Sequence, residues 1–344
     1  MRETLLEVRD LTVVFPTHEG DVQAVSDLSY TLHRGETIGI VGESGSGKSV
    51  SSLALMGLLN QERTRVSGEA LFGGRNLLSL PQSEMRDIRG KDLAMIFQDP
   101  FACLHPMYRV GDQIAEAVTA HASVSKSKAL DRAVELLDAV GIPKARDRAR
   151  DYPHQFSGGM RQRAMIAMAL ANNPSVLIAD EPTTALDVTV QAQILELIEK
   201  VKREFDIGVI LITHDLGVVA EAADEIVVMY AARVAEHAPV YSLFEQPLHP
   251  YTWGLLGSLP RLDVELERLT QIRGQPPSLL RPPAGCRFRP RCGYAFDRCR
   301  RELPEATRAG FDPDHLDACF LAEDRKLEES VRVVAELGLD EAAA

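Results

Sequence analysis

The sequence Gly-Glu-Ser-Gly-Ser-Gly-Lys-Ser at residues 42–49 constrains this chain more than any other segment. It follows the apolar, β-branched run Thr37–Val41 and leads into Ser49–Leu59, which has helical character. Strand, glycine loop and helix in this order are typical of a phosphate-binding loop. Glycines let the loop fold tightly, so that backbone N–H groups and the positive end of the helix face phosphate oxygens. The segment therefore predicts a nucleoside triphosphate site.

Each residue of this loop has an expected role. Lys48 should reach the β- and γ-phosphates of ATP, and the Ser49 hydroxyl should ligate Mg²⁺. Phe15 is the candidate to stack on adenine, with a place in the core as its alternative. The expected nucleotide contacts from the loop and the residue after it are Gly42, Glu43, Ser44, Gly45, Ser46, Gly47, Lys48, Ser49 and Val50.

Further polar residues follow apolar strand candidates. Val176–Ala179 leads into Asp180 and Glu181. Asp180 suits the Mg²⁺ shell, and Glu181 suits polarisation of the attacking water. Gln98 follows the strand candidate Leu93–Phe97, and its amide can touch both the metal and the water. His214 ends the strand candidate at 209–213 and can donate a hydrogen bond to the γ-phosphate. We expect Glu181, Gln98 and His214 to be catalytic.

Strands and helices alternate along much of the chain, which predicts an α/β fold with a largely parallel sheet. The N-terminal segments Leu5–Val8, Leu11–Phe15 and Val22–Leu32 are strand candidates. The spacing of Ala129, Ala133, Leu137 and Val140, with Gly141 as the stop, predicts helix within a mainly helical subdomain at about 100–155. Glu225–Tyr230 and Arg233–Glu236 predict a terminal hairpin. The expected domains are 1–255, a Pro/Arg/Cys-rich domain at 256–322, and an acidic tail at 323–344 that forms a weakly ordered helix.

Composition excludes several classes of protein. The formal net charge is -12, which argues against extended nucleic-acid binding, because that relies on clustered Lys and Arg. The longest apolar runs are far too short to cross a bilayer, and no signal peptide is recognisable, so we expect a cytoplasmic protein. Structural disulfides are not expected from five cysteines in that compartment.

The order of these motifs, together with Phe156-Ser157-Gly158-Gly159-Met160, resembles the ATP-binding cassette (ABC) family over roughly residues 5–260. The resemblance implies that Ser157, Gly158 and Gly159 bind the γ-phosphate of ATP held by a partner subunit. It also implies that Asp187 lies at the dimer seam. The fold that the resemblance implies is an ABC nucleotide-binding domain with a P-loop core sheet, an antiparallel β subdomain and a helical subdomain, followed by a small Cys-rich C-terminal extension. Phe156 and Met160 depart from the commonest signature, and Ala231-Ala232 stands where a glycine is usual.

Three stretches resemble the ATPase subunits of dipeptide and oligopeptide importers: 41–59, 180–193 and 249–252. The resemblance implies an ATPase at the cytoplasmic face of the inner membrane. Its expected partners are a second, homologous ABC ATPase subunit in a heterodimer, two transmembrane permease subunits and an extracytoplasmic peptide-binding protein. By analogy, the segment 99–114 would receive the coupling helix of a membrane subunit. Alternatives are a nickel or other peptide-like importer, an exporter, or a soluble ABC protein of translation or DNA repair.

The remaining feature is a group of cysteines near the C-terminus. Cys286, Cys292, Cys299 and Cys319 are separated by five, six and nineteen residues. Four thiolates suit Zn²⁺ or an iron–sulfur cluster, and the absence of a closely spaced pair disfavours zinc. The resemblance implies a [4Fe–4S] cluster with these four ligands; Zn²⁺ and free thiols are the alternatives. We interpret seven arginines between 281 and 301 as an offset to the cluster's negative charge, and the cluster as a staple in place of a hydrophobic core.

Overall fold

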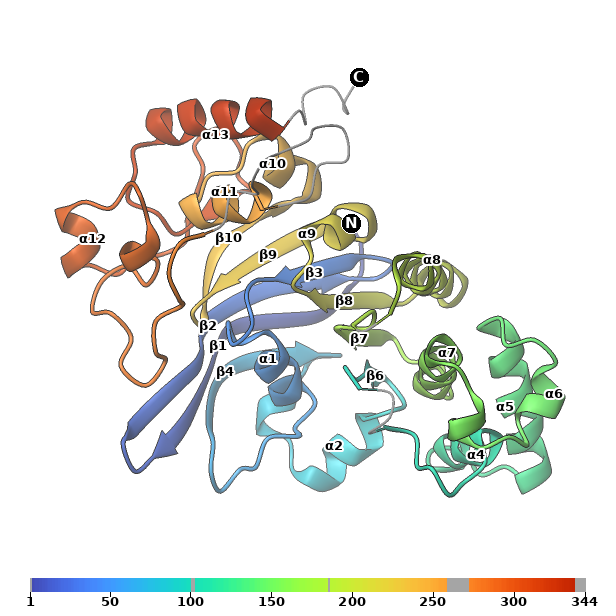
Figure 1. Cartoon of the computed structure of the whole chain (residues 1–344). Helices are drawn as coiled ribbons and strands as arrows, with labels where there is room; N and C mark the ends of the chain where they lie inside the picture. Colours follow the sequence, from blue (N-terminus) through green and yellow to red (C-terminus); the bar gives the residue numbers. More distant parts are fainter. Residues whose placement is uncertain (1, 100–102, 185, 259–271, 338–344) are drawn as a thin grey trace. The chain divides into compact units, whose positions relative to one another are not determined.

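The computed structural model describes residues 2–99, 103–184, 186–258 and 272–337 of the chain (Figure 1). The fold comprises two compact units. Unit 1 consists of Met1–Glu7, Thr31–Thr37 and Leu71–Ile212. Unit 2 consists of Val8–Tyr30, Ile38–Ala70 and Thr213–Ala344.

Unit 1 is built on parallel strands that are buried along their whole length. β7 (Val176–Asp180) pairs with β6 (Leu93–Ile96) on one side and with β8 (Gly208–Thr213) on the other. Every residue of the three strands is buried, which explains their continuous apolar sequence. Because parallel strands end at the same edge, the residues that follow β6 and β7 are brought close together there.

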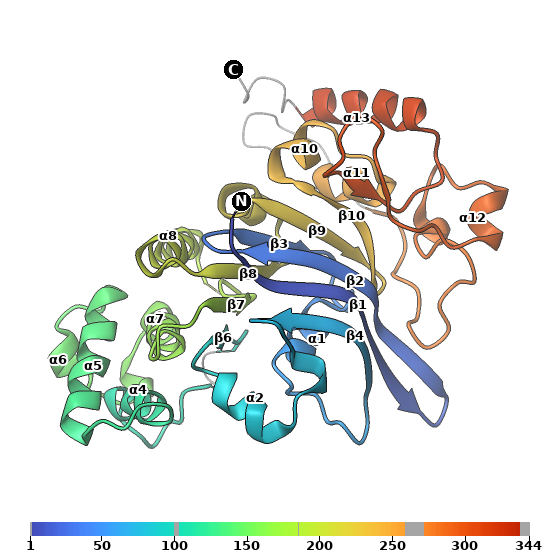
Figure 2. The same ribbon diagram turned by 180° about the vertical axis from the view of Figure 1, so that it is seen from behind.

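Helices make up most of the rest of unit 1. The stripe predicted at 129–140 is helix α5 (Lys126–Ala139), which Ser125 caps through its hydroxyl and which Gly141 follows at φ 77°. α5 packs against α4 (Val110–Thr119), α6 (Ala145–Arg148) and α7 (Gly158–Ala169), and the group is clear from both sides (Figure 2). α8 (Val188–Phe205) turns an apolar stripe inward. The shorter elements of this unit are β5 (Arg75–Asn76), α2 (Gln82–Ile88) and 3₁₀ turns at Leu77–Ser79 and Pro153–Gln155.

Unit 2 contains most of the long N-terminal strands. β1 (Thr4–Thr17) lies between β2 (Gly20–His33) and β4 (Arg65–Phe72). The two short strands predicted at 5–8 and 11–15 are one continuous strand. Asp10 interrupts the pattern with φ 50°, and its N–H donates to Ser29 Oγ at 2.8 Å. The side chain of Ser29 thus replaces a regular backbone partner, and the strand continues past the irregularity.

Another set of paired strands in unit 2 carries the phosphate loop. β3 (Thr37–Val41) runs parallel to β9 (Glu225–Tyr230), which forms the predicted hairpin with β10 (Arg233–Pro239). The short strands β11 (Thr307–Arg308) and β12 (Leu316–Asp317) extend this sheet beyond β10. Helix α1 (Lys48–Leu55) follows the loop, and α9 (Leu216–Ala222) precedes β9.

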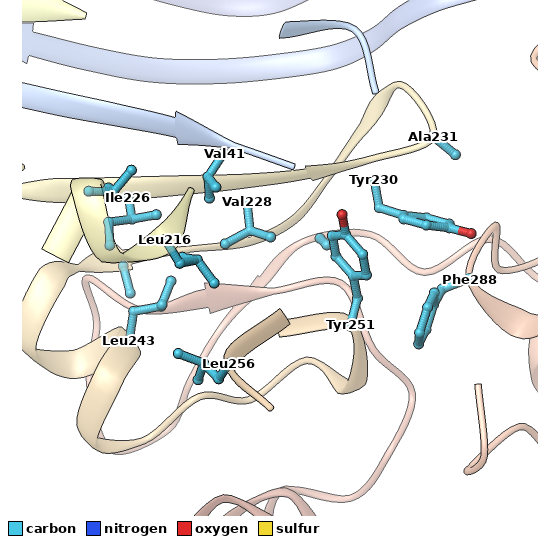
Figure 3. Packing of buried hydrophobic residues seen from close by; sticks show 13 residues of the cluster. Val41, Leu216, Ile226, Val228, Tyr230, Ala231, Leu243, Tyr251, Leu256 and Phe288 are labelled. Atoms are coloured by element: carbon cyan, nitrogen blue, oxygen red, sulfur yellow. The ribbon is translucent and has the colours of Figure 1, made fainter. Parts of the chain in front are cut away.

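The C-terminal part of unit 2 shares a hydrophobic core with this sheet (Figure 3). Phe288 of the Cys-rich segment is 4% exposed and packs with Tyr230 of β9 and Tyr251 of α11 (Pro250–Leu256). The expectation that this segment lacks a hydrophobic core is therefore wrong at Phe288. The remaining elements are α10 (Val240–Glu245), a 3₁₀ turn at Arg289–Arg291, α12 (Asp297–Arg301) and α13 (Glu323–Leu337). α13 is the predicted acidic helix, and it buries Lys326, Glu329, Ser330 and Val334.

Candidate functional site

The phosphate loop in unit 2 has a backbone that only glycine can adopt at two positions. Gly42 and Gly47 have φ values of 155° and 104°. A Cβ on Gly42 would lie 2.1 Å from the carbonyl oxygen of Met229, and a Cβ on Gly47 would lie 2.2 Å from that of Ala24. Both distances are far inside van der Waals contact. The glycines thus let the loop pack directly against two neighbouring backbone segments, as the sequence pattern requires.

Lys48 begins helix α1 and is almost completely buried, with 4% of its surface exposed. Its Nζ donates to the carbonyl oxygens of Gly42 at 2.6 Å and Glu43 at 3.1 Å. The ammonium therefore lies under the loop, close to the backbone that cradles phosphate in such motifs. Ser49 is half-buried beside it. Phe15, half-buried on β1, and the exposed His214 belong to the same unit.

The strand ends of unit 1 bring three polar side chains together, as the sequence predicted for two of them. Glu181 Oε2 accepts hydrogen bonds from Gln98 Nε2 at 2.8 Å and from Thr184 Oγ1 at 2.9 Å. Glu181 has φ 47°, an unusual conformation for a non-glycine residue, and its N–H donates to Ile212 O at 2.9 Å. Glu181 thus combines a strained backbone with a carboxylate that accepts two hydrogen bonds. Strained backbone of this kind clusters at functional sites. The neighbouring Asp180 is 6% exposed.

The Ser-Gly-Gly segment begins helix α7 of unit 1. Ser157 is the N-cap, and its Oγ accepts from the N–H of Met160 at 3.3 Å. Ser157 and Gly158 are exposed, so the positive end of the helix faces outward. A Cβ on Gly159 would lie 2.9 Å from Val190 Cγ1 of α8. Glycine therefore permits the close approach of α7 to α8 at this position.

Asp187 occupies the equivalent place on α8. It is the N-cap of that helix, and its Oδ1 accepts from the N–H of Val190 at 3.0 Å. The side chain is exposed, and the next residue, Val188, is the most exposed large apolar residue among those described, at 84%. Both helix starts in unit 1 thus present exposed groups that suit contacts with another molecule.

The four C-terminal cysteines line a single small pocket of unit 2. Burial raises the pKa of Cys292 to about 11 and that of Cys319 to about 12, and it also raises the pKa of Cys286. Such thiols stay protonated unless a cation displaces the proton. Across the described ranges, no group of three or more His, Cys, Asp or Glu side chains is close enough to hold a metal ion. The iron–sulfur and zinc predictions are not supported by that finding and stay predictions.

His315, which lies between Cys299 and Cys319 in the sequence, is not part of this pocket. It is fully buried, and its Nε2 lies 2.7 Å from Glu236 Oε1 on β10. Glu236 also accepts from the N–H groups of Leu248 at 2.6 Å and His249 at 3.0 Å. His315 thus belongs to a hydrogen-bonded network inside unit 2.

Comparison with known proteins decides the family. The ABC transporter family model matches residues 25–184, and a model for the oligopeptide/dipeptide transporter C-terminal region matches residues 235–299. The oligopeptide transport ATP-binding protein OppD of Salmonella typhimurium is 54% identical over 92% of this chain and 93% of its own length. The dipeptide transport ATP-binding protein DppD of Bacillus subtilis is 52% identical over 94% of this chain and 96% of its own.

The chain belongs to the family of oligopeptide and dipeptide ABC transporter ATP-binding proteins. Among solved structures, a dimeric ATP-binding cassette, MJ0796, bound to ADP and Pi is 26% identical, with a TM-score of 0.61 over 68% of this chain and 98% of its own. The fold is therefore that of an ABC nucleotide-binding domain, with ATPase activity as its chemistry. Each helix among the described residues is either too short or too polar to span a bilayer.

Within this ABC fold, the departure at Ala231-Ala232 has a structural compensation. Both alanines adopt positive φ, at 46° and 71°, where glycine would be unstrained. Arg287 from the Cys-rich segment donates through Nη1 to the carbonyl of Ala231 and through Nη2 to Gln23 Oε1 at 2.6 Å. The N–H of Ala232 donates to Ser46 O of the phosphate loop at 3.0 Å. The turn is thus held from both sides.

Sequence reasoning missed several of these contacts. Thr184, Tyr251, Arg287 and Arg291 each touch a predicted site residue or its immediate support. The sequence favours charge compensation of a cluster as the role of the arginines, whereas the side chains of Arg287 and Arg291 are buried against the phosphate-loop region of unit 2. Arg287 bonds Ala231, 56 residues away, and Arg291 bonds Glu43, 248 residues away, so no local spacing indicates these two contacts.

Proposed function

We propose that this protein is the ATP-hydrolysing subunit of a membrane importer for dipeptides or oligopeptides. The observation that carries the proposal is the match to named peptide-transport ATP-binding proteins at 54% and 52% identity over nearly the whole chain. This match includes the C-terminal region, which a general ABC ATPase of translation or DNA repair has no reason to share. We propose an ATPase domain at 1–255, a Cys-rich domain at 256–322 and a tail at 323–344.

In the ATP site, the loop amides and Lys48 would hold the triphosphate, with Phe15 against adenine. Mg²⁺ would be held by the oxygen groups of Ser49, Asp180 and Gln98, the kind of ligand that this hard cation prefers. Glu181 would take the proton of the attacking water, and its bond to Gln98 at 2.8 Å supports a shared role at that water. His214 would donate to the γ-phosphate.

A second, homologous subunit would complete the site. The exposed Ser157 and Gly158, together with the half-buried Gly159, would bind the γ-phosphate of ATP held by that subunit. Asp187 and the exposed Val188 would lie at the seam between the two chains. ATP would thus close the dimer, and its hydrolysis would allow the dimer to open.

The membrane subunits would contact the segment 99–114, of which residues 100–102 lie outside the described part. Met107 and Tyr108 are 75% and 59% exposed, and exposed apolar side chains of this size suit docking to another protein. Gln113 fixes their loop, because its amide bonds the backbone of both His105 and Tyr108 at 2.8–3.0 Å. Two permease subunits and an extracytoplasmic peptide-binding protein would complete a transporter with this chain at the cytoplasmic face.

For the tail, we propose that Cys286, Cys292, Cys299 and Cys319 hold a [4Fe–4S] cluster. Their common pocket supports this, since a four-iron cluster is larger than a single ion and its thiolates stand further apart. Anaerobic purification followed by iron and sulfide analysis tests it. About four irons and four sulfides per chain are expected, and both should be lost in Cys292→Ser. Iron-free protein, or one zinc per chain, would contradict the cluster.

Peptide uptake tests the main proposal. In cells whose only copy of this chain is a variant, Lys48→Ala should abolish uptake of a labelled dipeptide and a labelled oligopeptide. Lys200→Ala, which changes a lysine on α8, is the matched control and should leave uptake unchanged. Normal peptide uptake with Lys48→Ala would refute the proposal, and loss of nickel uptake alone would assign a different cargo.

A further inference from the structure

The C-terminal extension, which is the Cys-rich segment that contains Phe288 and Arg291, contacts the phosphate loop itself. We propose that Arg291, in this extension, is a positioning residue of the ATP site: it holds and neutralises Glu43, the second residue of the loop. Both residues belong to unit 2. Arg291 Nη1 lies 2.8 Å from Glu43 Oε2 and 3.0 Å from Oε1. The Arg291 side chain is 5% exposed and that of Glu43 is 26% exposed, so the pair is partly shielded from water.

Arg291 is itself fixed in place by the chain around it. Its Nε donates to Arg273 O at 3.0 Å, and its Nη2 donates to Ile272 O at 3.2 Å. The guanidinium also lies 5.7 Å from the centre of the Tyr230 ring. A guanidinium whose other N–H groups are already bonded presents its free edge in one direction. Here that direction is the carboxylate of Glu43.

The backbone of Glu43 is held by a second contact. Its N–H donates to the hydroxyl of Tyr251 at 3.0 Å. Tyr251 is completely buried, and its ring packs 4.6 Å from that of Tyr230 and 5.4 Å from that of Phe288. Figure 3 shows these three rings turned toward one another. The side chain and the backbone of one loop residue are therefore both tied to the segment that includes α11 and the Cys-rich extension.

This arrangement has an electrostatic consequence. A carboxylate in a phosphate loop brings a negative charge toward the anion that the loop must bind, which disfavours binding. Arg291 offsets that charge and keeps the carboxylate turned toward itself. Without Arg291, the negative charge of Glu43 would be uncompensated beside the triphosphate. Arg291 thus acts on ATP through Glu43, which separates this role from simple anchoring of the extension.

The test rests on the proposed ATP site and measures equilibrium binding of a non-hydrolysable ATP analogue with Mg²⁺ to the full-length chain. Arg291→Met should weaken binding about tenfold. Glu43→Gln should tighten it by about twofold, because the charge of Arg291 then faces the loop unopposed. The double variant should return to within about threefold of wild type. Arg291→Lys keeps the positive charge but lacks the planar guanidinium with its several N–H donors, so its affinity for the analogue should lie between those of wild type and Arg291→Met.

The controls separate this role from its alternatives. Arg289→Met changes a neighbouring arginine that bonds Arg300 O within the extension, and it should leave binding unchanged. In the assembled ATPase, Arg291→Met should raise the KM for ATP while kcat stays within about twofold. A double variant as weak as Arg291→Met would overturn the inference in favour of an anchoring role, and so would unchanged binding in Arg291→Met. Unchanged binding in Lys48→Ala would instead refute the ATP site itself.

Discussion

Replacement of Glu181 by Gln tests the proposed chemistry at its centre. The carboxylate accepts from Gln98 and Thr184 at 2.8 and 2.9 Å, and Gln can preserve this geometry through its amide oxygen. What the substitution removes is the negative charge and the proton acceptor. General-base catalysis contributes about 10²–10⁴-fold, so the barrier to hydrolysis should rise by roughly 3–5 kcal/mol. ATP binding should change little, because the loop and Lys48 belong to a different set of contacts.

The assay is phosphate release by the complete transporter, with a partner ATPase subunit that cannot hydrolyse ATP, so that turnover reports this site alone. ATP affinity is measured in parallel on the same preparation. Glu196→Gln, on the exposed side of α8, is the matched control and should retain full activity. Retention of more than about a tenth of wild-type turnover in Glu181→Gln would refute its assignment as the base.

Three further predictions concern stability. Phe288→Ala should lower the free energy of unfolding by about 3–5 kcal/mol, because it opens a cavity beside Tyr230 and Tyr251. The control Phe296→Ala, at a 42% exposed site, should lower it by less than about 1 kcal/mol. Urea unfolding measures both variants, and equal losses would contradict the packing of Phe288. Burial lowers the pKa of His249 to about 4 from 6.5, so the unfolded chain binds the proton more readily. The free energy of unfolding should therefore fall, by at most roughly 3 kcal/mol, as the pH drops from about 6.5 to 4. His249→Asn keeps an acceptor for the Tyr251 N–H and should flatten that dependence; an unchanged slope would exclude His249 as its source. Asp206 lies at the exposed end of α8 with φ 52°, a conformation that glycine adopts without strain. Asp206→Gly should therefore raise the free energy of unfolding by about 1 kcal/mol and raise the melting temperature. A lower melting temperature would show that the Asp206 side chain matters more than backbone strain.

Features that depend on neighbours in sequence were predictable. The phosphate loop, the strand ends at Asp180 and Gln98, and the helix at 126–139 each follow from a local pattern of residue types. The buried parallel strands are short apolar runs, and polar residues mark where they end. Residues that follow adjacent parallel strands meet in space. For this reason the sequence could place Gln98 and Glu181 in one site, and the two side chains are hydrogen-bonded in the structure.

Element boundaries were less predictable. Helix α1 was expected to run to Leu59 but ends at Leu55. Gly57 adopts φ 60°, its N–H donates to Ala54 O, and the N–H of Leu58 donates to Leu53 O at 2.9 Å. This pair of bonds is a Schellman motif, which glycine at that position permits. The apolar residues on both sides of Gly57 masked the signal.

Long-range contacts had no signal in a single sequence. Arg291 lies 248 residues from Glu43, and Arg287 lies 56 residues from Ala231. An arginine-rich segment with few acids indicates exposure to an anion or a solvated surface far more often than burial. Only the fold reveals that two of these arginines are buried beside the phosphate loop, where each satisfies a carboxylate or a carbonyl.

We propose that ATP hydrolysis by this chain drives peptides across a membrane. The most direct test of this proposal is the complete transporter in liposomes, supplied with ATP and a peptide-loaded binding protein, with hydrolysis and peptide accumulation measured on one sample. We predict that peptide accumulation requires ATP and is saturated by peptide. Accumulation and hydrolysis should be lost together when Glu181 of this chain and the corresponding base of the partner cassette are both replaced by Gln. Hydrolysis that continues at full rate without any peptide movement, or accumulation that persists without hydrolysis, would contradict the account.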